Sequence, residues 1–228
     1  MRIIIWILSA LLLGVMIALW YGNSNPLYYF AWWRTGGISR WSALEIAFNN
    51  IIVIAMMLYG GVLGAMLEIK SWEKMSPKLY LALDKICYPL HFIFSIFDSK
   101  LKNLKHPFKS CYFITVSFAP AVLFINLLIF GSLITQLLYT YGINTRTVAY
   151  LSHQTLPLAL IEFGCMGVAT IISLKFPYQN YKIFENGELQ ALRCELKSYL
   201  TSPRNFFLML GISIILSISA WWEHSMLY

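Results

Sequence analysis

The sequence predicts an all-α fold, a polytopic helical membrane bundle with five transmembrane helices. Of its 228 residues, 59% are hydrophobic and 12% are charged, whereas soluble globular domains carry about 25% charged residues. Its apolar stretches approach or exceed the roughly 20 residues that cross a ~30 Å hydrocarbon core. We therefore expect one multi-pass domain, residues 1–228, in the cell membrane.

Five apolar stretches are the predicted spans. The first, 3–20, resembles a signal peptide. Its apolar part is longer than the usual 7–15 residues and no small-x-small cleavage site follows it, so we interpret it as an uncleaved anchor. The other predicted spans are 45–67, 112–139, 149–174 and 206–222.

Two further segments are predicted to be cytoplasmic. The long loop 69–111 contains an apolar segment, 86–97, that is short and broken by Pro89. Its length favours an interfacial or re-entrant segment over a span. Residues 181–201 predict an amphipathic helix, because apolar side chains recur at helical spacing. These are Leu189, Leu192, Leu196 and Tyr199. We expect both segments on the inner leaflet, with a docking surface for a cytoplasmic partner as the alternative.

The distribution of positive charge predicts an amino terminus inside and a carboxyl terminus outside. Lys and Arg near helix ends favour the cytoplasmic side. Five spans place 14 of the 17 basic residues on that side, leaving Arg34, Arg40 and Arg146 outside. The net charge of +7 thus serves orientation and contact with anionic lipid headgroups. No nucleic-acid partner is expected, because the chain has no basic soluble domain.

Glu162 is the residue most informative about function. It lies in the middle of an apolar run from Ala149 to Lys175, where an ionisable side chain costs about 2.5–3.5 kcal/mol on insertion scales. Its helix face carries small and weakly polar side chains, so that face should point into the bundle. Asn126 lies at similar depth in the preceding span, and a hydrogen bond between it and a protonated Glu162 is predicted.

Other polar side chains complete the predicted intramembrane site. Asn49 and Asn50 lie one turn in from the outer surface, and His153 lies near the outer end of the fourth predicted span. The site has three interpretations: it fixes helix packing, it is a proton- or ion-linked site or part of a substrate path, or a partner helix supplies the contact.

Glycines in the spans predict close helix packing. Gly60 and Gly64 form a GxxxG pair, which lets two helix backbones approach. Gly131, Gly164 and Gly167 are the further packing candidates.

Nothing in the sequence indicates catalysis. The zinc-protease, nucleophile-elbow and phosphate-loop motifs do not occur, and no Cys/His spacing suggests a metal site. We expect neither a catalytic residue, a metal nor a cofactor.

Three blocks resemble the stage II sporulation protein M family of integral membrane proteins. The first is the span from Asn49-Asn50 to Gly64, and the second is Asn126 followed by Gly131. The third is Leu156-Pro157-Leu158-Ala159-Leu160-Ile161-Glu162, which is similar to a family signature Leu-Pro-His-Gly-x-x-Glu. Leu158 and Ala159 replace the histidine and glycine of that signature. The resemblance implies a non-enzymatic membrane component.

The predicted function is therefore a membrane scaffold or accessory subunit of a membrane complex. Its expected partners are the lipid bilayer and other membrane or cytoplasmic proteins, or further copies of the chain. The alternative is a small transporter or permease subunit in which Glu162 is linked to a proton or ion.

Overall fold

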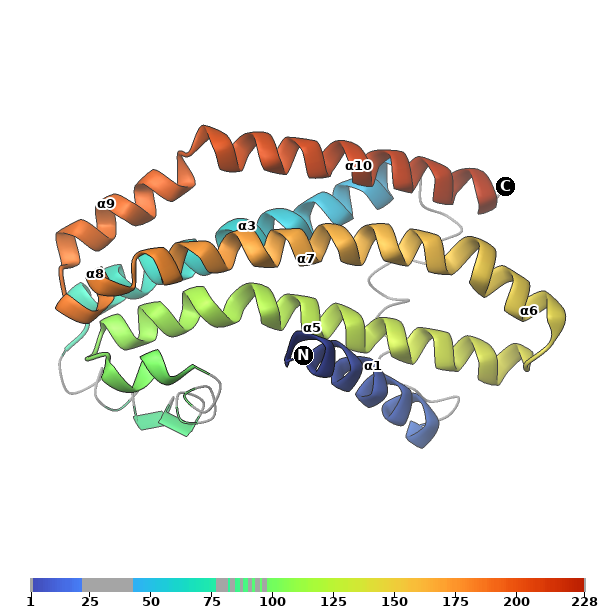
Figure 1. The fold of residues 1–228 in the computed structure, drawn as a ribbon, viewed down its shortest axis with the longest axis horizontal. Helices are drawn as coiled ribbons and strands as arrows, with labels where there is room; N and C mark the ends of the chain where they lie inside the picture. The colour runs from blue at the N-terminus through green and yellow to red at the C-terminus, as the bar shows by residue number, and fades with distance from the viewer. Residues whose placement is uncertain are drawn as a thin grey trace. The chain divides into compact units, whose positions relative to one another are not determined.

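Helices make up most of the part of the chain that a computed structural model describes (Figure 1). This part comprises residues 2–21, 43–76, 82, 85–86, 88–89, 92, 95 and 98–227. The predicted all-α class is confirmed for this part. The longest elements are α1 (Arg2–Tyr21), α3 (Ala43–Lys74), α5 (Phe108–Tyr141), α7 (Leu156–Gln179) and α10 (Pro203–Leu227). The shorter ones are η3 (Ser99–Asn103), α6 (Thr145–Tyr150), η4 (Leu151–Thr155), α8 (Tyr181–Asn186) and α9 (Leu189–Leu200).

Within the described residues, four helical stretches are long and apolar enough to cross a membrane, which indicates a membrane protein. They are Ala47–Lys74, Phe108–Tyr141, Thr145–Gln179 and Leu189–Trp222. Each overlaps one of the predicted spans 45–67, 112–139, 149–174 and 206–222. The apolar stretch Ile7–Tyr21 of α1 is shorter, so the predicted span 3–20 stays a prediction.

The predicted span 149–174 is part of a longer helical stretch with an irregular start. Asn144 caps α6, because its Oδ1 accepts a hydrogen bond from the Thr147 amide at 2.9 Å. The wider π-turns of η4 come directly before α7. Pro157 in the first turn of α7 lacks an amide N–H and cannot donate to His153, so the widening falls where a backbone donor is missing.

The chain divides into two compact units. The first comprises Met1–Ile54, Ala121–Val168 and Leu210–Tyr228, and the second comprises Ala55–Pro120 and Ala169–Met209. The second unit has its own apolar core, formed by the ends of α3, α5 and α7 together with α8, α9 and residues around η3. Its buried members include Ile69, Tyr112, Phe176, Phe184, Leu192 and Leu196.

The long helices extend beyond the predicted spans into this second unit. α3 runs seven residues past the predicted end at Leu67, and α5 starts at Phe108, before the predicted start at Tyr112. At about 1.5 Å per residue, helices of 32 and 34 residues exceed a ~30 Å hydrocarbon core. The predicted loop 69–111 is therefore helical at both ends.

The predicted single helix over 181–201 is wrong in two respects. Gly187 adopts a positive φ of 72° and ends α8 as its left-handed C-cap, with its amide donating to the Ile183 carbonyl oxygen. A second helix, α9, therefore begins at Leu189. Leu192 and Leu196 are fully buried in the core of the second unit. The apolar stripe thus packs against protein, where we expected it to face the inner leaflet.

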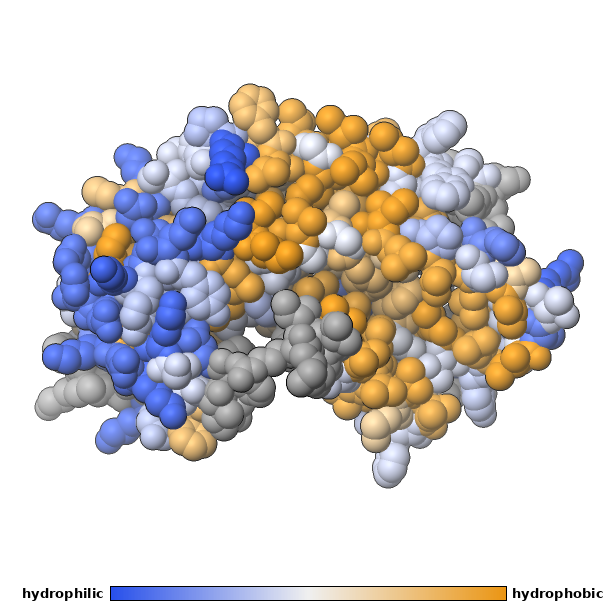
Figure 2. All heavy atoms as spheres, viewed as in Figure 1, coloured by the Kyte–Doolittle hydropathy of each residue, from blue (hydrophilic) through white to orange (hydrophobic). Residues whose placement is uncertain are grey.

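The predicted interfacial segment 86–97 lies mostly outside the described residues. Among its described positions, Ile86, Tyr88 and Phe92 are helical and exposed. Exposed aromatic and aliphatic side chains are typical of a helix that contacts a membrane surface. Figure 2 shows polar side chains gathered over α8 and α9, whereas apolar side chains cover α10.

Candidate functional site

A hydrogen bond joins Asn50 of α3 to Glu162 of α7 in the first unit. The Asn50 Nδ2 donates to the Glu162 Oε1 at 2.5 Å. Asn50 is buried and Glu162 is half-buried. Burying a carboxylate is costly unless a hydrogen-bond donor meets it, and Asn50 supplies that donor.

The helix face that carries Glu162 is buried as predicted. Around it, Ala159, Cys165, Met166 and Ala169 are all less than 9% exposed. Phe163 packs edge-to-face on Phe130 of α5, with ring centroids 5.1 Å apart. Small side chains beside Glu162 therefore allow other helices to approach it closely.

The predicted contact between Glu162 and Asn126 is replaced by the contact with Asn50. The Asn126 Nδ2 donates at 2.8 Å to the Val122 carbonyl oxygen, one turn earlier in its own helix. Asn126 therefore bonds to the backbone of its own helix, and the carboxylate of Glu162 receives its donor from α3.

The remaining predicted polar residues have different surroundings. Asn49 is half-buried next to Asn50, on α3. His153 is exposed within η4. The structure thus supports Asn50 and Glu162 as the centre of the site and shows no contact that would bring His153 to them within the described residues.

The predicted packing glycines fall into two groups. A Cβ atom at Gly60 would lie 2.3 Å from the Phe118 ring, and one at Gly64 would lie 2.8 Å from Ile114 Cγ2. Both contacts join α3 to side chains of α5 in the second unit, so this GxxxG pair makes room for Phe118 and Ile114. The α5 backbone itself comes near Gly61, where a Cβ would lie 3.2 Å from Thr115 Cα. At Gly164 and Gly167 a Cβ would meet no atom of the described residues within 4 Å, and the packing role predicted for these two is not supported.

The backbones of α1 and α5 approach each other closely in the first unit. A Cβ at Gly14 would lie 2.1 Å from the Leu128 carbonyl oxygen, and one at Gly131 would lie 2.6 Å from the Leu11 carbonyl oxygen. Gly131 was predicted and Gly14 was missed. The signal is present in the sequence, because Ala10, Gly14 and Ala18 recur at four-residue spacing and all three are buried.

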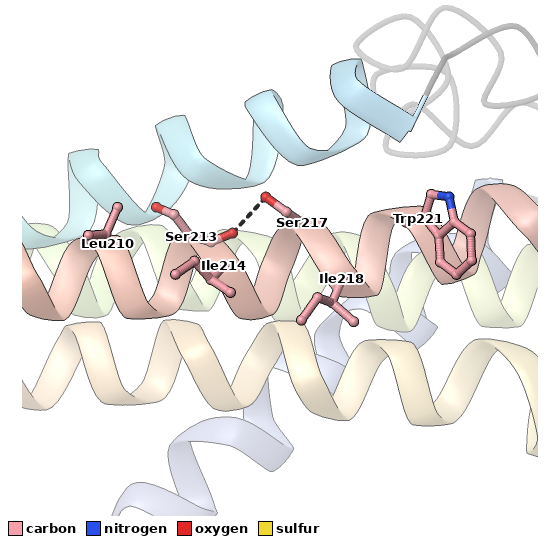
Figure 3. Close-up of a pocket in the computed structure, with 6 residues that line it drawn as sticks. All are labelled: Leu210, Ser213, Ile214, Ser217, Ile218 and Trp221. Atoms are coloured by element: carbon pink, nitrogen blue, oxygen red, sulfur yellow. Dashed lines mark hydrogen bonds between the residues drawn. The ribbon is translucent and has the colours of Figure 1, made fainter.

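A shallow apolar groove follows the outer face of α10 (Figure 3). Its volume is about 460 Å³. The Ser217 hydroxyl donates to the Ser213 carbonyl oxygen at 2.8 Å, so this hydroxyl serves its own helix. The groove is lined by Leu210, Ser213, Ile214, Ser217, Ile218 and Trp221. This composition suits lipid chains or another apolar helix and offers no group for chemistry.

In the second unit, Asp98 connects η3 to α5. One carboxylate oxygen accepts the Lys100 amide at 3.1 Å, and the other accepts the Tyr112 hydroxyl at 2.9 Å. The Tyr181 hydroxyl donates to the Lys100 carbonyl oxygen at 3.2 Å, and the Lys100 ammonium lies 4.8 Å from the Tyr178 and Tyr181 ring centroids. Burial, with a smaller effect of the nearby Glu185 carboxylate, raises the pKa of Tyr181, which keeps this hydroxyl a donor. These contacts are structural.

No group of three or more His, Cys, Asp or Glu side chains that could hold a metal ion occurs among the described residues. Comparisons of the chain with protein-family models, with curated proteins and with solved structures find no match.

Proposed function

We propose that the chain is a non-enzymatic integral membrane scaffold or accessory subunit of a membrane complex. The observation that carries this proposal is the hydrogen bond between Asn50 and Glu162. Polar side chains that bond across membrane helices stabilise helix association. The costly carboxylate of Glu162 therefore has a structural use, and no substrate is needed to explain it.

The proposed topology has five spans in the cell membrane, with the amino terminus inside and the carboxyl terminus outside. Its first span is α1, whose 20 residues measure about 30 Å. The close contact of Gly14 with the α5 backbone supports this assignment, because such an approach is typical of packed membrane helices. The 14-to-3 distribution of basic residues supports the orientation.

The resemblance to the stage II sporulation protein M family is part of the proposal. Two of the three blocks that carry it, the paired asparagines and the Leu-Pro signature ending in Glu162, supply the two ends of one hydrogen bond. A third feature of the resemblance, Gly131, lies at the α1–α5 contact. Asn50 and Glu162 join α3 to α7, and Gly131 lets α5 pack against α1. Residues of all three blocks thus take part in helix packing, which supports the resemblance.

A transporter subunit is the second candidate, because Glu162 is half-buried and Asn50 leaves it able to bind a proton. An amide donor is compatible with an ionised or a protonated carboxylate, since in both states at least one oxygen accepts. In this case Glu162 would exchange a proton or cation during transport.

The substitution Glu162→Gln separates the two functions. Glutamine keeps an acceptor for Asn50 and removes the titratable group. The scaffold function predicts unchanged co-purification of partner proteins in mild detergent, and no flux driven by a pH gradient in proteoliposomes of either protein. The control is Glu185→Gln, at an exposed position of α8.

A flux that the unsubstituted protein supports and Glu162→Gln abolishes would refute the scaffold and support the transporter. Loss of partner proteins from Glu162→Gln, with Glu185→Gln unaffected, would show that the carboxylate charge itself is required for assembly.

A further inference from the structure

A polar cavity of about 340 Å³ lies in the second unit, where the end of α7 faces the turn between α9 and α10. Two basic side chains line it, Lys175 from α7 and Arg204 from the first turn of α10. In the described part of the chain, neither is paired with a carboxylate. Glu195 is the acidic residue of the wall, so the cavity carries an excess of positive charge.

Neutral polar groups surround these two cations. The Asn205 Nδ2 donates to the Tyr199 carbonyl oxygen at 3.0 Å, and Asn205 is itself buried. This bond fixes the turn that presents Arg204. Ser198 and Ser202 add hydroxyl groups to the wall. An anion in the cavity would therefore meet both charge and hydrogen-bond donors.

The Tyr199 side chain adds an unexplained polar atom. Its hydroxyl oxygen is enclosed and has no hydrogen-bond partner among the described residues, although Tyr199 lines the same cavity. Buried hydroxyls in most proteins form a hydrogen bond with protein atoms or with ordered water. The ring itself is held by edge-to-face contacts with Tyr59 and Phe176.

One part of the cavity wall is apolar. Ile172 and Phe176 of α7 and Leu208 of α10 line it, and both helices belong to stretches apolar enough to cross a membrane. A ligand that fills the whole cavity must therefore combine an anionic group with a hydrocarbon part. A free phosphate ion would leave this part of the wall without a contact.

We propose that the cavity binds the phosphate group of an anionic phospholipid. Lys175 and Arg204 contact the phosphate, since Arg and Lys are the side chains that proteins use to bind this group. Ile172 and Leu208 contact the first methylenes of an acyl chain. This site is separate from Asn50 and Glu162, and it goes beyond the proposed scaffold function.

The test measures lipid binding to the purified full chain by native mass spectrometry in mild detergent. Phosphatidylglycerol is the probe, and the test variant is Lys175→Gln with Arg204→Gln. We expect it to bind phosphatidylglycerol about tenfold or more weakly, because each basic residue near an anionic lipid contributes substantially to attraction. The matched control removes two exposed charges that do not line the cavity, by Lys182→Gln with Lys197→Gln, and should change binding less than about twofold.

Further measurements identify the source of the phosphate. Phosphatidylcholine should bind the unsubstituted protein more weakly, and inorganic phosphate should neither bind at the cavity nor displace phosphatidylglycerol. If inorganic phosphate alone displaced phosphatidylglycerol, the cavity would be a site for a free anion and the proposed lipid site would be wrong. An equal loss of binding in the control pair would overturn the site, because it would show attraction to the surface as a whole.

Folding is checked without lipid. The test variant should unfold at the same temperature as the unsubstituted protein, and phosphatidylglycerol should raise that temperature only for the unsubstituted protein and the control. An equal rise in the test variant would also overturn the site. Retention of partner proteins tests the scaffold separately and does not depend on this cavity.

Discussion

Asn50 and Glu162 are separated by 112 positions in the sequence and meet through one side-chain hydrogen bond. Each belongs to a helix long and apolar enough to cross a membrane. In a hydrocarbon environment no water is present to form a hydrogen bond with either side chain if the other is removed. The bond therefore specifies which face of α3 meets which face of α7 within the first unit.

A double-mutant cycle at Asn50 and Glu162 should show favourable coupling. Replacing either residue by leucine leaves the other polar group without its partner, whereas replacing both removes that penalty. We expect a coupling free energy of about 0.6–1.7 kcal/mol, the range of such bonds in membrane proteins. Unfolding in detergent of the four proteins measures it.

Asn126 provides the control for this cycle, because its amide donates within α5. Leucine substitutions at Asn126 and Glu162 should be additive within about 0.5 kcal/mol. A coupling larger for Asn126 than for Asn50 would contradict the observed pairing.

Alanine at Gly14 should destabilise the first unit. Its Cβ would enter the van der Waals radius of the Leu128 carbonyl oxygen, which belongs to the backbone and cannot rotate away. We expect a loss of about 1–3 kcal/mol, as for other overpacked sites, measured by thermal unfolding in detergent. Gly164→Ala is the matched control: its Cβ would meet no described atom within 4 Å, and alanine favours helix by up to about 1 kcal/mol. Equal unfolding temperatures for the two variants would refute the close approach of α1 and α5.

Alanine at Leu192 should lower the stability of the second unit by about 2–5 kcal/mol, the cost of a large-to-small change in a packed core. Leu192 is fully buried in that core. Leu160→Ala is the control, because this leucine of α7 is 68% exposed. Thermal unfolding measures both. If Leu192→Ala weakened binding to lipid vesicles and left unfolding unchanged, the α9 stripe would lie on the membrane and not in the core.

Phenylalanine at Tyr112 should release η3 from α5. It removes the hydroxyl that Asp98 accepts, at a cost of about 1.5–3 kcal/mol for a hydrogen bond to a charged group. Trypsin should then cleave faster at Lys100 and Lys102, which lie in η3. Tyr139→Phe on the same helix is the control, because Tyr139 is 61% exposed. Unchanged cleavage in Tyr112→Phe would show that other contacts hold η3.

The helices of the fold could be predicted because apolar run length reports directly on membrane spans. The buried face around Glu162 also followed from helical periodicity. The partner of Glu162 could not be predicted in this way. Asn126 lies at a similar predicted depth, but a contact also requires that the two side chains face each other. Which faces meet depends on packing between helices distant in sequence, and Asn50 has the required direction.

Glycine shows the same limit. Gly60 and Gly64 lie against side chains of α5, whereas at Gly164 and Gly167 a Cβ would meet no atom of the described residues within 4 Å. Gly14 was missed because it stands in a leucine-rich run that accounts for the span without it. The break at Gly187 was missed because the predicted helix 181–201 depended on the spacing of Leu189, Leu192, Leu196 and Tyr199, which all follow Gly187. A single left-handed residue interrupts a helix without changing its apolar pattern.

The contact at Gly14 also fixes the position of α1 along α5. A shift of α1 by one residue would bring the side chain of Leu13 or Val15 against the Leu128 carbonyl oxygen, so α1 has one allowed position along α5. Each residue inserted before Gly14 would then extend the amino terminus by about 1.5 Å along the helix axis and leave the rest of α1 in place. Residues deleted there would shorten α1 by the same step, and the contact between Gly14 and the α5 backbone would stay as it is.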